Sequence, residues 1–141
     1  MKRILLFILF SFNLQAQVVT WSPLFPSRND TITVLFNAQE GNRGLVGATE
    51  VYAHTGVITN KSVQSSDWRY LKTTWGYNTP ETRLQQIDTD LWQLCFHIQS
   101  YYNVPFDETI KQLAFVFRKL RSLAKPEYPQ RQQRQWLRFD L

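Results

Sequence analysis

The chain has 141 residues with a single cysteine, and its formal net charge is +5. The positive charge lies at the two ends: residues 17–118 hold eight basic and nine acidic side chains, whereas residues 119–141 hold six basic and two acidic ones. This distribution argues against a nucleic-acid-binding surface, and one cysteine excludes an internal disulfide, so the stability of a single domain has to come from a packed core.

The first 16 residues have the order of a secretory signal peptide. Two basic residues precede an apolar run from Ile4 to Phe12, and Ala16 supplies the small residue before the expected cleavage site. The mature chain is therefore expected to begin at Gln17. The apolar run is shorter than the roughly 20 residues that span a bilayer. We expect no stable membrane insertion after cleavage, and a bacterial protein that is secreted, periplasmic or on the cell surface.

Residues 17–118 show short strands separated by turn residues, a pattern typical of a sandwich or barrel. No stretch shows sustained apolar spacing at three and four residues, so helices are expected to be minor. The pattern predicts one all-β domain, an immunoglobulin-like antiparallel β-sandwich of about 6–8 short strands. The expected strands are Val18–Trp21, Asp30–Phe36, Thr49–Thr59, Asp67–Trp75, Asp90–Ile98 and Thr109–Arg118.

Two of these strands are expected to supply much of the core. Trp92 lies in alternating register with Leu94 and Phe96, so the three side chains should share one buried face. Phe115 and Phe117 belong to the most apolar stretch after the signal peptide, and their strand should be covered on both faces.

The central part shows no recognisable catalytic set. It contains two histidines, His54 and His97, and no nucleophile elbow, metal-ligand spacing or phosphate-binding glycine loop. Its acidic residues are scattered, and nothing pairs them in the way that glycoside hydrolysis needs. We expect no catalytic residue, metal or cofactor here; any activity would belong to a missing downstream domain, such as a glycoside hydrolase. The scattered acidic residues are Asp67, Asp88, Asp90, Asp107 and Glu108.

Aromatic residues in the middle of the chain are the most informative feature. Flat rings pack against the C–H faces of pyranose sugars, while neighbouring polar side chains bond to the hydroxyl groups. Any single ring could equally belong to the core. Trp68 and Trp75 stand next to charged, Gly and Asn residues, so a loop-edge position is expected for them. The aromatic and imidazole side chains concerned are Tyr52, His54, Trp68, Tyr70 and Trp75.

Several segments together carry a resemblance to a known group of domains. They are residues 50–59 (EVYAHTGVIT), 66–70 (SDWRY), 75–76 (WG), 98–104 (IQSYYNV) and 113–118 (LAFVFR). In combination they resemble the N-terminal immunoglobulin-like, carbohydrate-binding-type domain of secreted bacterial α-amylase-like proteins. They are similar, more distantly, to the starch-binding modules of carbohydrate-binding families 25 and 26. The closer resemblance covers about residues 18–118.

In those starch-binding modules, a Tyr or His on one strand and one or two Trp on the following segments stack on consecutive glucose units. The resemblance therefore implies ligand-binding roles for Tyr52 or His54 and for Trp68 or Trp75. It implies a non-catalytic module that binds polysaccharide of α-glucan or starch type, cut off from a larger secreted polysaccharide-degrading protein. The alternatives are an immunoglobulin-like spacer without a ligand, and an independent secreted protein whose basic tail binds an anionic surface.

Residues 119–141 form an atypical basic tail at which the resemblance ends. After Arg118 such domains continue with a turn rich in Asn, Asp and Gly and a final strand, whereas this chain has a run of Gln and Arg at 130–135. Read one base later, Gln and Arg codons give Asn, Ser, Gly, Ala, Asp or Val, the composition of the missing turn. One explanation is a frameshift after Arg118 that replaced the last strand. The other is a native basic tail, disordered or helical.

Overall fold

The computed structural model describes residues 17–119 and 137–140. These residues contain seven strands and two short helices. The predicted signal peptide, residues 1–16, lies outside them, as does most of the tail. None of the helices in the described ranges is long and apolar enough to cross a membrane. The elements are β1 (Val19–Ser22), β2 (Thr31–Asn37), β3 (Val51–Thr59), the 3₁₀ helix η1 (Pro80–Thr82), β4 (Gln85–Asp88), β5 (Leu91–His97), α1 (Ile98–Tyr102), β6 (Ile110–Lys119) and β7 (Leu137–Asp140).

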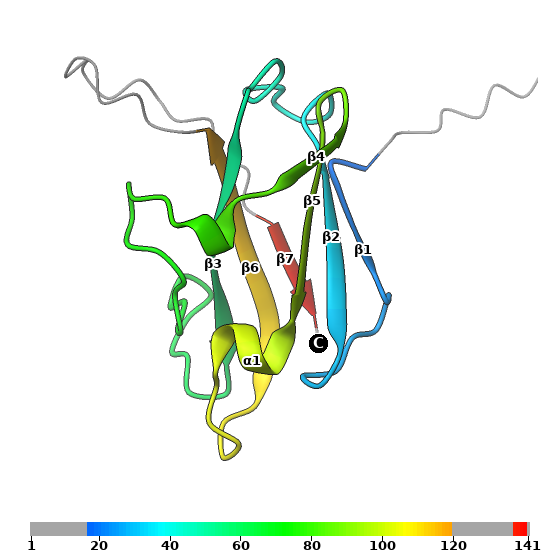
Figure 1. Cartoon of the computed structure of the whole chain (residues 1–141). Coiled ribbons are helices and arrows are strands. Elements are labelled where there is room, and N and C mark those ends of the chain that lie inside the picture. The colour runs from blue at the N-terminus through cyan, green and yellow to red at the C-terminus, as the bar shows by residue number, and fades with distance from the viewer. Residues whose placement is uncertain (1–16, 120–136, 141) are drawn as a thin grey trace, which may run out of the picture.

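The strands form two antiparallel sheets that pack against each other (Figure 1). One sheet has the strand order β1-β2-β5-β4, and the other has the order β3-β6-β7. These orders correspond to the A-B-E-D and C-F-G sheets of a constant-type immunoglobulin domain. The prediction of an all-β, immunoglobulin-like antiparallel sandwich is confirmed.

Alternating side chains from both sheets build the core. On β2, Ile32, Val34 and Phe36 are buried, and on the neighbouring β5 the cross-strand partner of Phe36 is Trp92, which is also buried. The ring of Phe36 stacks on Phe117 of the opposite sheet at a centroid distance of 4.5 Å. The predicted burial is confirmed for the whole set of core residues singled out from the sequence: Trp92, Leu94, Phe96, Phe115 and Phe117.

The predicted strand Asp67–Trp75 is wrong, because this segment belongs to a long loop. Within it only Arg69 forms a β-bridge, with Val57 on the free edge of β3. The next residue, Tyr70, has a φ of 52°, in the left-handed region, which turns the chain out of an extended path. We call residues 60–79 the aromatic loop.

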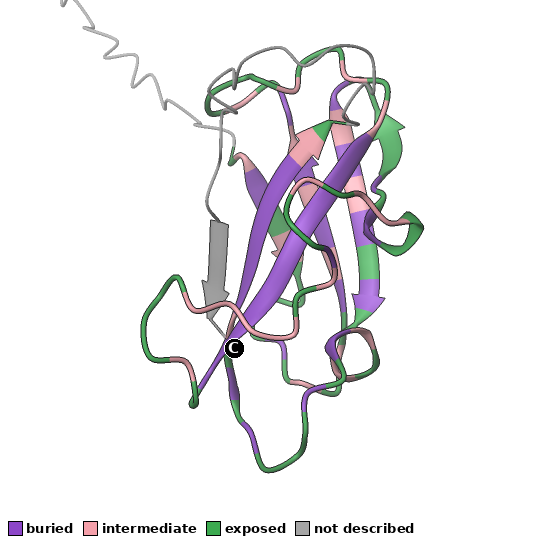
Figure 2. Cartoon of the chain, turned by 90° about the vertical axis from the view of Figure 1, so that its left-hand side faces the viewer, coloured by how far each residue is buried: buried purple, intermediate pink, exposed green. Residues whose placement is uncertain are grey.

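The aromatic loop covers the outer face of the β3-β6-β7 sheet. All nine residues of β3 are buried, although only one of its faces points into the core. Figure 2 faces this sheet and shows loop segments crossing in front of the purple, buried strands. The contact is close at Gly56, where an added Cβ atom would lie 2.9 Å from both the Arg69 carbonyl oxygen and Leu71 Cδ2. A larger residue at position 56 would therefore displace the loop.

Strand β7 comes from the atypical tail and pairs antiparallel with β6. Its four residues lie opposite Gln112–Phe115, so β7 occupies the position of the last strand in an immunoglobulin-like domain. Residues 120–136, which connect it to β6, lie outside the described residues. Both explanations of the tail, the frameshift and the native basic segment, stay predictions.

Candidate functional site

A buried carboxylate anchors the first half of the aromatic loop. The side chain of Glu108 is 1% exposed and lies 3.2 Å from Arg69 Nε and 3.4 Å from Lys61 Nζ. It also accepts hydrogen bonds from the Thr59 hydroxyl and from the Tyr70 hydroxyl, the latter at 2.7 Å. The hydrogen bond from Thr59 is the main cause that lowers the pKa of Glu108 below its ordinary value. The ionised Glu108 thus ties the loop to β3.

Replacing Glu108 with glutamine is expected to loosen the aromatic loop while the sandwich stays folded. A neutral amide removes the charge that holds Arg69 and Lys61. It can also accept hydrogen bonds on only one of its two terminal atoms, the oxygen. Hydrogen–deuterium exchange measured by mass spectrometry should be faster in residues 61–72 of this variant. The matched control is Asp107→Asn, an exposed neighbour that contacts Lys61 alone among these groups. Equal exchange in both variants would contradict the anchoring role.

His54 lies beneath the second half of the loop. Its side chain points outward from β3 but is only 6% exposed, because three loop residues cover it. Its Nδ1 is 2.6 Å from the hydroxyl oxygen of Thr73. The imidazole stacks on Trp68 at a centroid distance of 5.9 Å and meets Trp75 edge-on at 4.9 Å. His54 therefore supports two tryptophans from below and is not itself a surface group.

The environment of His54 keeps the imidazole neutral. Burial, together with the smaller effect of the positive charge of Arg118, lowers its pKa from 6.5 to about 4. Arg118 lies on β6, where its cross-strand partner is Tyr52, the outward-facing residue two positions before His54. At neutral pH the imidazole is thus an uncharged packing and hydrogen-bonding group.

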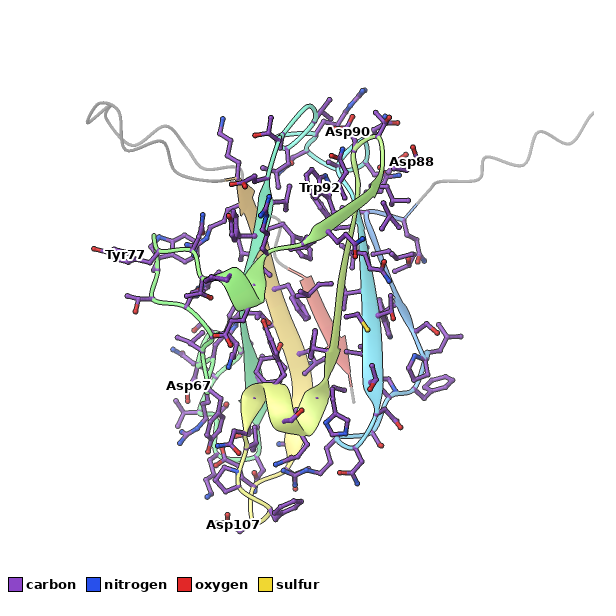
Figure 3. The ribbon with its side chains drawn as sticks, viewed as in Figure 1. Asp67, Tyr77, Asp88, Asp90, Trp92 and Asp107 are labelled. Carbon is purple, nitrogen blue, oxygen red and sulfur yellow. The ribbon has the colours of Figure 1, made fainter. Side chains whose placement is uncertain are left out.

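Two exposed aromatic rings lie above this cluster. The side chain of Trp75 is 40% exposed and that of Tyr77 is 71% exposed. Gly76 between them has a φ of 91°, a conformation that L side chains rarely adopt. Tyr77 points away from the sandwich in Figure 3. We call Trp75 and Tyr77 the aromatic platform.

Arg118 holds the backbone of the aromatic platform. One of its terminal nitrogens donates a hydrogen bond to the carbonyl oxygen of Tyr77 and lies 3.5 Å from the Thr73 hydroxyl. The guanidinium carbon is 5.8 Å from the centroid of the Trp75 ring, within cation–π range. A charged group of β6 is thereby placed directly beside the most exposed tryptophan of the loop.

The structure brings together three of the four residues that the resemblance implied. His54, Trp68 and Trp75 form one cluster, in which Trp75 is exposed, Trp68 is half-buried and His54 is covered. Tyr52 is buried on the same strand, and its hydroxyl donates to Glu50 at 3.1 Å. Stacking of His54 on a ligand would require the loop to move aside. Tyr77, whose ring is the more accessible part of the platform, was not among the residues predicted.

Apart from Glu108, the scattered acidic residues lie in or next to turns and loops. Figure 3 shows Asp107 at the lower end of the sandwich, and Asp88 and Asp90 at the upper end. Asp90 accepts a hydrogen bond from the backbone of Gly47 at 2.7 Å, which fixes a turn. In the described part of the chain, no three His, Cys, Asp or Glu side chains form a group that could hold a metal ion.

Comparison with known proteins adds the family of the domain. Residues 19–123 match the family described as Domain of unknown function (DUF8578), a range that includes β1 to β6 and the whole aromatic loop. No curated protein matches the chain. Because the match covers well over half of the sequence, the chain belongs to the family Domain of unknown function (DUF8578).

Proposed function

We propose that this domain is a non-catalytic carbohydrate-binding module of α-glucan type in a secreted polysaccharide-degrading protein. The observation that supports this proposal is the aromatic platform. Its Trp75 ring is 40% exposed, and it also packs edge-on against the buried His54 imidazole, at a centroid distance of 4.9 Å. A ring that is already immobilised loses little conformational entropy when a sugar stacks on it. The resemblance to amylase-associated domains favours α-glucan as the polymer.

Polar groups flank the aromatic platform on both sides along the chain. Lys72 and Glu81 form an ion pair at 3.4 Å, and Arg83 and Glu50 form another at 2.7 Å. The side chains of Glu81 and Arg83 are about half exposed, so they are accessible to a ligand. Aromatic rings, with such donors and acceptors on neighbouring segments of the chain, suit the two chemical sides of a pyranose, its C–H face and its equatorial hydroxyl groups.

The test of this function is the substitution Trp75→Ala. Loss of one stacking contact and its buried apolar area should weaken glucan binding by roughly 1–3 kcal/mol, or about 5- to 150-fold. Affinity electrophoresis in gels with amylose, pullulan, xylan or no polymer measures the effect. In the parent protein, tryptophan fluorescence should also change when maltooligosaccharide is added. The matched control is Phe25→Ala, because Phe25 is fully exposed on the β1–β2 connection, away from the loop.

Folding has to be measured separately, because a collapsed core also abolishes binding. Trp92→Ala should unfold the domain, since Trp92 is buried between the sheets. If folded Trp75→Ala and Trp68→Ala variants bind glucan as well as the parent, the proposed function fails. It fails equally if no polymer retards the parent, and the ligand-free spacer then takes its place. Retardation that disappears with added salt and requires residues 119–141 would indicate the anionic-surface alternative.

A further inference from the structure

Arg118 carries a positive charge that no acidic side chain in the described part of the chain pairs with. Its neighbours are the Trp75 ring, the Thr73 hydroxyl and the Tyr77 carbonyl, all of which are uncharged. Among residues 17–119, no Asp or Glu oxygen forms an ion pair with it. Its Nε is buried and has no hydrogen-bond partner in the described residues, so the guanidinium retains unused donor capacity. Arg118 is half-buried, and charges that are partly removed from water are usually paired.

Glu50, which precedes β3, and Glu81, which follows the aromatic loop, already have cationic partners. Glu50 pairs with Arg83, and Glu81 pairs with Lys72. Within the described residues, Arg118 is therefore a cation beside the aromatic platform that has no acidic partner. Burial lowers its pKa, and its positive charge contributes to the lowered pKa of His54.

We propose that the aromatic platform binds a pyranose that carries a carboxylate, and that Arg118 recognises this carboxylate. The inference rests on the proposed carbohydrate-binding function and narrows its ligand from a neutral glucan to a uronate-containing one. A planar guanidinium forms charge-assisted hydrogen bonds to carboxylates that neutral hydroxyls cannot match. A ligand of this class would stack one sugar face on Trp75 and place its negative charge beside the unpaired cation.

The sharpest test compares two polymers that differ only in charge. Amylose and C6-oxidised amylose share the same α-1,4 backbone, and oxidation converts the C6 hydroxymethyl group to a carboxylate. The full chain should bind the oxidised polymer at least about 10-fold more tightly than amylose at low ionic strength, the gain expected of a charge-assisted hydrogen bond. The preference should shrink as salt is added, because salt screens a partly exposed pair.

Substitution of Arg118 distinguishes recognition of a ligand carboxylate from structural support of the aromatic loop. In Arg118→Met the ratio of the two affinities should fall to about one, while Arg118→Lys, which retains the charge, should keep part of the preference. If Arg118 only supports Tyr77, both affinities fall together and the ratio stays at the parent value. Lys111→Met is the matched control: it removes the same charge from an exposed position at the other end of β6 and should leave the ratio unchanged.

The outcomes distinguish this inference from the function on which it rests. Equal binding of both polymers, or tighter binding of amylose, overturns the role of Arg118 and leaves the carbohydrate-binding function standing. A parent protein that binds neither polymer overturns both. A preference for oxidised amylose that Arg118→Met retains also overturns the inference, because another cation would then recognise the carboxylate.

Discussion

Replacing Phe115 with alanine is expected to lower the free energy of unfolding by about 3–5 kcal/mol. Phe115 is fully buried in the middle of β6. Its ring lies 6.0 Å from that of Phe117 on the same strand and 6.3 Å from that of Phe96 in the opposite sheet. Truncation therefore removes an aromatic contact between the sheets and leaves a cavity in the core.

Urea unfolding followed by circular dichroism measures this loss. Phe25→Ala is the matched control, because Phe25 is 94% exposed and its truncation should change the free energy of unfolding by no more than about 0.5 kcal/mol. The two variants make the same chemical change in opposite environments. A loss below about 1 kcal/mol in Phe115→Ala would mean that β6 does not lie at the centre of the core.

The strands that could be predicted from the sequence are those that bury either one face or both faces, because burial leaves a pattern of apolar residues. In β2 and β5, apolar residues alternate with polar ones, because one face packs on the core and the other meets water. The apolar run at 110–119 marks β6, which is covered on both sides. β4 was missed because it is an exposed edge strand with no apolar alternation. The pairing order of the two sheets depends on contacts between distant segments, which local patterns do not reveal.

The false strand at residues 67–75 has a physical cause. Its aromatic residues pack against β3 from a loop, and Arg69 alone forms a β-bridge to that strand. The left-handed φ of Tyr70 interrupts the extended backbone. No residue type in the segment predicts this conformation. The Tyr70 hydroxyl donates a hydrogen bond to the carboxylate of Glu108, which lies 38 residues later in the chain. Such a long-range anchor has no local signal.

The candidate site was accessible to sequence reasoning only in part. The Gly and Asn residues after Trp75 predicted a loop-edge position, and the structure places Trp75 there with an exposed ring. The resemblance implied a ligand-binding role for Tyr52 or His54. It did not show that both side chains are buried. The glycine at 76, flanked by two aromatic residues, was the available signal for including Tyr77.

Stability is expected to fall as the pH is lowered from about 6.5 towards 4, because the folded protein keeps His54 neutral. The unfolded chain takes up a proton near the ordinary histidine pKa of 6.5, whereas the buried imidazole resists protonation until about 4. The unfolded state thus binds more protons throughout this window, and the free energy of unfolding decreases with falling pH. The loss amounts to about 2 kcal/mol between pH 7 and pH 5, and to about 3 kcal/mol once both states are protonated.

Urea unfolding of the parent and of His54→Gln at pH 7, 6 and 5 isolates this contribution. Glutamine is neutral throughout and can still hydrogen-bond to Thr73, so the variant should lose much less stability over that range. The lowered pKa values of Glu108 and Asp30 also reduce stability in acid, but mainly below their ordinary values of 4.5 and 3.8. His97 is present in both proteins and cancels in the comparison. If His54→Gln loses as much stability as the parent between pH 7 and pH 5, the imidazole is not held neutral, and the packing of Trp68 and Trp75 upon it would need revision.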